Sequence, residues 1–145
     1  MRAYHFLRAD MRSSNGEEAP WLAGETRTVR GKLELCKRGY HSCPTLGDCL
    51  NYIYGPIACI VEVSEPVAHD EHKQVSHSRT LISARDVSRE LRLWALECAE
   101  HVAHLSSDPR VAECNAVTRR YLSREATVGQ LAAARAAAWG AAAGA

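Results

Sequence analysis

Residues 35–63 read LCKRGYHSCPTLGDCLNYIYGPIACIVEV, and this stretch decides which fold we expect. In its middle, apolar side chains recur with helical spacing, at Leu46, Cys49, Leu50 and Ile53. Gly55-Pro56 ends that helix, because proline cannot continue one. Residues 57–63 are apolar and rich in β-branched side chains, as in a buried central strand. The stretch therefore predicts a short helix over 44–54 that leads into the central strand of a sheet.

The segment before this stretch predicts a strand followed by a loop. Residues 3–8 alternate, with Tyr4 and Phe6 on one face of a strand and His5 and Leu7 on the other. Residues 11–24 are loop-like, and we expect their Trp21-Leu22 pair to pack onto the core.

Three further extended segments are expected. Residues 25–36 alternate and predict two strands broken at Gly31, with Leu33 and Leu35 pointing inward. Residues 39–43 form another extended piece, and residues 73–82 predict a strand at an edge of the sheet.

Composition changes near residue 84, after which the chain has no lysine and is rich in alanine and arginine, two good helix formers. A first helix is expected over 84–105. A second begins at Asp108-Pro109, where aspartate caps a helix and proline suits its first position. A third begins at Thr127, because T-x-x-Q matches a capping box. The first helix should bury one apolar face, formed by Val87, Leu91, Trp94, Ala95, Cys98, Val102 and Leu105.

The chain is thus predicted to be an α+β protein. Residues 1–83 should form a small, twisted, mainly antiparallel sheet with one short helix. Residues 84–145 should add a layer of about three helices that either packs on the sheet or forms an interaction surface, such as that of a homodimer.

Composition excludes several classes of protein. The chain has 145 residues with 18 basic and 17 acidic side chains, so it is not a strongly electrostatic nucleic-acid binder. No window approaches the roughly 18–20 apolar residues that span a bilayer, so no membrane partner is expected. The first ten residues are charged and unlike a signal peptide, which predicts a cytoplasmic protein.

Six cysteines are spaced without any C-x-x-C pair, so the strong zinc signature is absent. Most occupy positions where an apolar residue is expected, and we interpret them as buried structural thiols. Cys43 is the candidate for a reactive thiol, since it lies beside His41 and just before a helix.

A metal site is considered at His69-Asp70-Glu71-His72, which offers two imidazoles and two carboxylates. His69 and His72 are the metal candidates, although a solvated turn is the commoner meaning of such a run. His101 and His104 share a helix face but lack the H-E-x-x-H order of a zinc protease, so no metal ligand is assigned there.

Basic residues cluster in the segment 27–38, and the binding candidates are Arg27, Arg30, Lys32, Lys37 and Arg38. They predict a patch for a phosphate or an acidic protein surface, or else a solvated strand face interleaved with Glu25 and Glu34. Nucleic acid is the less favoured partner, because no stacking aromatic residues alternate with these charges.

The stretch 35–63 resembles a family of uncharacterised small domains from phage and bacterial genomes, whose signature is a glycine-aromatic-histidine turn followed by a short helix and a strand. Gly39, His41 and Cys43 carry the most specific part of this resemblance, which extends from about residue 4 to 81. Residues 84–145 resemble the alanine- and arginine-rich helical segments that follow such domains, for example WALECAEHV at 94–102. Neither resemblance implies an activity.

The same order of elements has a distant resemblance to the NAD-binding half of ADP-ribosyltransferases. That resemblance implies that His5 would hold the nicotinamide ribose and that Tyr40 or Tyr52 would stack on the ring. The family also uses a late glutamate, and residues 73–83 contain none. The resemblance is therefore compatible with a shared fold without the activity.

The leading functional hypothesis is a non-catalytic accessory or anti-defence protein of a phage or mobile element, for example anti-CRISPR-like, that needs no cofactor and binds a host protein or protein complex. The alternatives are an NAD-dependent ADP-ribosyltransferase-like enzyme, with His5, Tyr40, His41 and Tyr52 as candidate site residues, and a metal-binding protein. Convergence of the histidines and Tyr52 with a carboxylate in one cleft would favour the enzyme.

Overall fold

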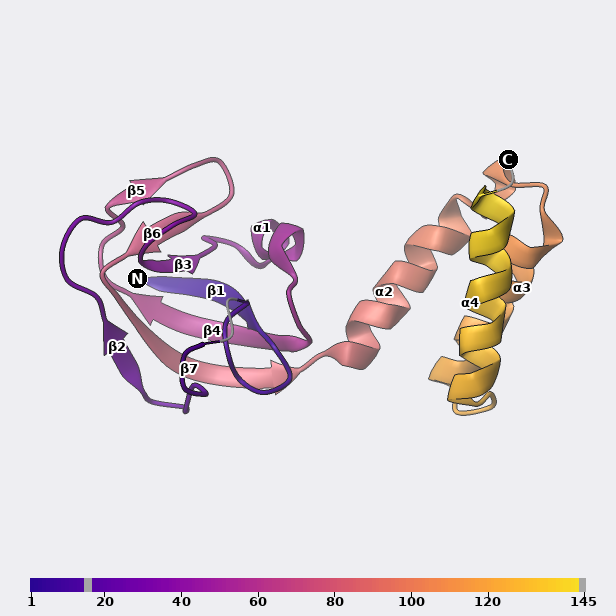
Figure 1. Ribbon diagram of the computed structural model, residues 1–145, viewed down its shortest axis with the longest axis horizontal. Coiled ribbons are helices and arrows are strands. Elements are labelled where there is room, and N and C mark those ends of the chain that lie inside the picture. Colours follow the sequence, from indigo (N-terminus) through magenta and orange to yellow (C-terminus); the bar gives the residue numbers. More distant parts are fainter. Residues whose placement is uncertain (15–16, 144–145) are drawn as a thin grey trace. The chain divides into compact units, whose positions relative to one another are not determined.

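The computed structural model describes residues 1–14 and 17–143 and divides the chain into two compact units, residues 1–87 and 88–145 (Figure 1). The first unit is built on antiparallel strands with one short helix, and the second contains the remaining helices. The predicted α+β class is confirmed. The boundary falls after Val87, because residues 84–86 belong to a strand of the first unit.

A four-stranded antiparallel sheet forms the larger part of the first unit. Its strands are β1 (Arg2–Leu7), β4 (Ile57–Val63), β7 (Ser78–Asp86) and β2 (Thr26–Thr28), and they lie in that order. β4 is a central strand, as its run of β-branched residues predicts (Figure 1).

A smaller three-stranded sheet contains β3 (Tyr40–Ser42), β6 (Gln74–Ser76) and β5 (Ala68–His69). Two backbone hydrogen bonds of 2.9 Å between Tyr4 and Cys43 tie the end of β3 to β1. The short helix α1 (Leu46–Cys49) follows, capped by the side chain of Thr45 and continued by a 3-10 turn over Leu50–Tyr52.

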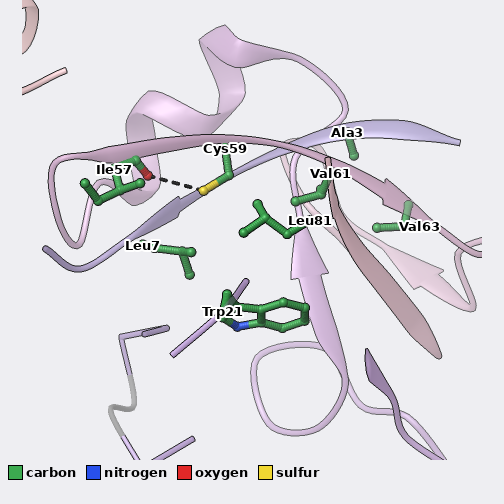
Figure 2. Packing of buried hydrophobic residues seen from close by; sticks show 8 residues of the cluster. All are labelled: Ala3, Leu7, Trp21, Ile57, Cys59, Val61, Val63 and Leu81. Carbon is green, nitrogen blue, oxygen red and sulfur yellow. Dashed lines mark hydrogen bonds between the residues drawn. The ribbon is translucent and has the colours of Figure 1, made fainter. Parts of the chain in front are cut away.

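The hydrophobic core of this unit lies against one face of the larger sheet (Figure 2). Its members come from β1, β4, β7 and the loop after β1, and are Ala3, Leu7, Trp21, Ile57, Cys59, Val61, Val63 and Leu81. Trp21 is 2% exposed, as predicted, but its neighbour Leu22 is 68% exposed, so the expectation that both pack inward was wrong for Leu22.

The segment 25–36 forms one strand rather than the predicted two. Leu33 is buried but Leu35 is only half-buried, and a turn closed by backbone hydrogen bonds between Glu34 and Arg38 replaces the second strand. Cys36 has a φ of 68° within this turn, which an alternating strand cannot contain.

The segment 73–82 is not an edge strand. It divides at His77 into β6 and β7, and each of these has a partner strand on both sides. The sequence suggests an edge because the residues are polar. However, the structure buries three of them, Gln74, Ser76 and Arg79.

The second unit contains α2 (Ser88–His101), α3 (Pro109–Leu122) and α4 (Val128–Ala143), with a 3-10 turn over Ala103–Leu105. The predicted starts of α3 and α4 are confirmed. The side chain of Asp108 accepts from the backbone of Arg110, and Thr127 and Gln130 form a reciprocal capping box.

The predicted apolar face of the first long helix is wrong. α2 begins at Ser88 instead of residue 84, because β7 continues its pairing with β4 as far as Asp86. Leu96 is the residue of α2 that is buried, whereas Trp94, Val102 and Leu105 are exposed.

The six thiols are free, but they are not all structural. Cys43, Cys49 and Cys59 are buried and Cys114 is half-buried, whereas Cys36 and Cys98 are exposed. The expectation of buried thiols is therefore wrong for these last two. Within the described part of the chain, no helix has the length and apolar character needed to cross a bilayer.

Candidate functional site

A cavity of about 430 Å³ in the first unit is lined by all four residues predicted as catalytic candidates, His5, Tyr40, His41 and Tyr52. They come from β1, β3 and the turn after α1, and β1 is distant in the sequence from the other two. Gly39 makes this arrangement possible. Its φ is 124°, and an added Cβ would lie 2.4 Å from Cγ2 of Val75.

Arg79, on β7, is the buried cation of the cavity, with 3% of its surface exposed. Its guanidinium lies 4.4 Å from the ring of Trp21 and 5.3 Å from that of Tyr40, and donates to the His41 carbonyl and the Ser13 hydroxyl at 3.1 Å. Burial lowers its pKa to about 10, so it stays protonated at neutral pH.

Glu18 supplies a carboxylate to the lining of the same cavity. One of its oxygens accepts from the Ser13 backbone and from the Trp21 indole, both at 2.8 Å, and the other lies 3.5 Å from Arg27. Burial acts to raise its pKa, but the hydrogen bonds from Ser13 and Trp21 and the charge of Arg79 outweigh burial and lower it. Glu18 is therefore ionised.

His5 is held in its neutral form. Burial is the main reason that its pKa lies well below the usual value, and the nearby Arg79 and His41 lower it further. Its Nε2 atom is buried and has no hydrogen-bond partner among the described residues.

His41 is held by the turn that precedes it. Its Nε2 accepts from the backbone N–H of Cys36 at 2.8 Å, which places the ring proton of the neutral form on Nδ1. Burial, followed by the charges of Lys73 and Arg79, lowers its pKa. His41 is therefore a neutral group in a positively charged environment.

Aromatic rings and a lysine also line the cavity. The Lys73 ammonium lies 4.7 Å from the centre of the Tyr52 ring, and Tyr54 adds an exposed phenol. Tyr40 packs edge-on against Trp21, so its ring orientation is fixed by the core.

Cys43 lines the cavity but makes no hydrogen bond with His41 among the described residues. A hydrogen bond from the Cys49 thiol lowers the pKa of Cys43 and raises that of Cys49. The Nε2 atom of His41 is already occupied by the Cys36 backbone. The geometry thus gives a pair of thiols rather than the predicted Cys–His pair.

The predicted basic residues have different roles. Arg27 is largely buried, ion-paired to Glu25 at 2.7 Å and stacked 4.2 Å from the Trp21 ring, so it stabilises the fold. Lys37 lines the cavity and pairs with Glu34, and Arg38 donates to the carbonyl of Arg30. The side chains of Arg30 and Lys32 are exposed.

The metal candidates do not come together. His72 contacts Asp48 at 3.1 Å, and Asp70 closes a turn by accepting from the backbones of His72 and Lys73, whereas His69 lies in β5. No group of three or more potential ligands that could hold a metal ion occurs among the described residues.

Sequence reasoning missed Arg79, Glu18 and Lys73. The signal for Arg79 was its position two residues before the buried Leu81, which puts both side chains on the inner face of β7. Glu18 lies in a loop, where no periodic pattern marks the residues that face the core.

The comparison with family models identifies a domain of unknown function, DUF7666, that matches residues 1–96. The match covers the entire first unit and the beginning of α2. No curated protein and no solved structure matches the chain.

Proposed function

The chain belongs to the DUF7666 family of domains of unknown function, and from this premise we propose that its amino-terminal unit binds a small organic ligand, with NAD as the leading candidate, in the cavity around His5 and His41. One observation carries the proposal: side chains from distant segments converge on that cavity together with the carboxylate of Glu18. Polar groups that converge in a concave site are typical of ligand binding.

The chemistry of the lining supports a nucleotide-like ligand. The rings of Tyr40 and Tyr52 offer faces for stacking on a planar base, and the neutral imidazole of His5 offers a hydrogen bond to an oxygen of the ligand. These are the residues that the resemblance to ADP-ribosyltransferases implies.

The proposal is limited to binding and does not include transfer of ADP-ribose. Transfer would need a carboxylate free to stabilise the ribose as nicotinamide leaves. Glu18 instead is engaged with Ser13, Trp21 and Arg27 inside the fold. A nicotinamide-release assay on the same samples therefore tests the enzyme alternative separately.

Isothermal titration calorimetry of the full chain with NAD and with ADP-ribose tests the proposal. We expect a saturable 1:1 heat that Tyr52→Leu weakens about tenfold, because a lost stacking contact costs on the order of 1 kcal/mol. Tyr121→Leu, in the second unit, is the matched control and should bind as the native chain does. If neither NAD nor ADP-ribose gave binding heat, the proposal would be contradicted.

A second candidate function has its own observation. The second unit exposes large apolar side chains, including Trp94, Leu105 and Trp139, and such exposure is typical of interaction surfaces. It supports the hypothesis of an accessory or anti-defence protein, of phage or mobile-element type, that binds a host protein complex or forms a homodimer through these helices.

Recovery from a bacterial lysate at micromolar concentration tests this second candidate. We expect the native chain either to recover a stoichiometric partner from the lysate or to sediment as a dimer. Trp139→Ser should lose that partner or that dimer. Tyr52→Leu is the control, since it changes the other unit. A monomer without any stoichiometric partner would rule the candidate out.

A further inference from the structure

We propose that the buried end of the cavity is an anion subsite, in which the Arg79 guanidinium and the Nε2 atom of His5 bind a carboxylate or phosphate group of the ligand; this assignment rests on the proposed function of the same cavity. Arg79 and His5 come from β7 and β1, on either side of β4.

The first argument is the charge of Arg79. Among the described residues, its guanidinium is in no ion pair, and the nearby Glu18 forms one with Arg27. Removing a cation from water costs several kcal/mol unless an opposite charge lies beside it. The charge of Glu18 also stabilises the guanidinium, but that carboxylate forms no direct ion pair with it. Together with the aromatic faces and two neutral acceptors it compensates only part of the cost, so an anion in the cavity would complete the site.

The second argument is the unpaired nitrogen of His5. A buried polar atom without a hydrogen bond is rare in native proteins and calls for an explanation. With its proton on Nε2, the neutral ring donates a hydrogen bond, which a ligand oxygen would accept. Its neighbours on the same face of β1, Ala3 and Leu7, belong to the hydrophobic core and offer it no polar group.

A purely structural role explains the position of Arg79 but not the unpaired nitrogen of His5. Stacking on Trp21 and hydrogen bonds to Ser13 and His41 would suffice to hold the arginine in place. They leave the imidazole nitrogen unpaired beside a cation. One anionic group that contacts both side chains satisfies the two at once, and a carboxylate or phosphate offers the paired oxygens that a guanidinium binds best.

Thermal unfolding of the full chain, at constant ionic strength and neutral pH, tests the subsite with inorganic phosphate, acetate and chloride. We expect the melting temperature of the first unit to rise by about 8 °C at ten times the dissociation constant of the preferred anion, and to rise further with the logarithm of its concentration. The phosphate and acetate arms decide between the two anionic groups, and chloride should have no such effect.

Three variants make the result specific. His5→Phe keeps a ring but removes the ring nitrogens. Arg79→Lys keeps the charge but loses the guanidinium that binds two oxygens at once. Each variant should raise the dissociation constant for the anion at least tenfold. Arg89→Gln removes an exposed arginine of the second unit and should leave the anion response unchanged. The subsite would be overturned if His5→Phe responded as the native chain does, or if neither phosphate nor acetate raised the melting temperature of the native chain more than chloride does.

The outcome also separates this inference from the proposed function. If phosphate or acetate binds with these variant effects while NAD does not, the subsite stands and NAD is the wrong ligand. If NAD binds and both variants bind it as tightly as the native chain does, the cavity binds ligand and the subsite is wrong.

Discussion

Two histidines of the cavity, His5 and His41, make the stability of the first unit depend on pH. Their pKa values are lowered in the folded state, mainly by burial, whereas an unfolded histidine titrates near 6.5. Above that pH both states are neutral. Below it the unfolded chain binds protons that the folded chain does not, so acid favours unfolding.

We therefore predict that the free energy of unfolding decreases as the pH falls from 7 to 5, by at most about 1.4 kcal/mol per pH unit for each histidine. Urea denaturation at a series of pH values measures this slope. His5→Phe should reduce it, whereas His104→Asn, an exposed control in the second unit, should not. The pKa of Glu18 is lowered from 4.5, so its contribution is lost only at lower pH. If the free energy of unfolding of His5→Phe changed with pH as steeply as that of the native chain, His5 would not be a source of the pH dependence.

Two glycines with positive φ differ in their surroundings, which separates backbone strain from steric crowding. At Gly39 an added Cβ meets Val75 at 2.4 Å, whereas at Gly24, with a φ of 82°, nothing lies within 4 Å. Gly24→Ala should cost about 1 kcal/mol of strain, and Gly39→Ala about 2 kcal/mol more from the clash. Thermal unfolding compares them, and equal losses would show that the turn relaxes around the methyl group.

At the level of elements, local signals predicted better than periodicity did. The starts of α3 and α4 were identified from Asp108 and Thr127, because a cap depends on residues only two or three positions apart. The extent of β7 and the buried face of α2 could not be predicted, since both depend on distant partners. Buried polar residues such as Arg79 and Ser76 made β6 and β7 look exposed.

The capping box of α4 gives a prediction for this level. Thr127→Ala removes the acceptor for the Gln130 backbone and should lower the stability of the second unit by about 1 kcal/mol. Thr127→Ser retains the hydroxyl and should recover most of the loss. Circular dichroism during thermal unfolding measures both, and equal melting temperatures for the alanine variant and the native chain would show that the cap is dispensable.

At the level of the whole molecule, topology decides which residues meet. His5, Tyr40, His41 and Tyr52 were chosen from the sequence by type and by resemblance, and the fold brings them to one cavity. Their convergence could not be deduced from spacing, because it depends on the antiparallel pairing of strands and on the bridge between Tyr4 and Cys43.

The core and the cavity both lie within the first unit, which predicts that residues 1–96, the extent of the family match, fold without the rest. The fragment should give a dispersed NMR spectrum and melt within about 5 °C of the same unit in the full chain, a difference of on the order of 1 kcal/mol. A poorly dispersed NMR spectrum of the fragment would mean that α3 and α4 are required for folding.

The two exposed thiols have a practical consequence. Cys36 lies in the first unit and Cys98 in the second, so the native chain offers one accessible attachment point for a maleimide label on each. With the half-buried Cys114 changed to serine, a pair of spin labels or fluorophores would report the distribution of distances between the units in solution. Because Cys36 also lines the cavity, protection of this thiol from maleimide by phosphate or NAD, with Cys98 as the reference, would report occupancy of the cavity.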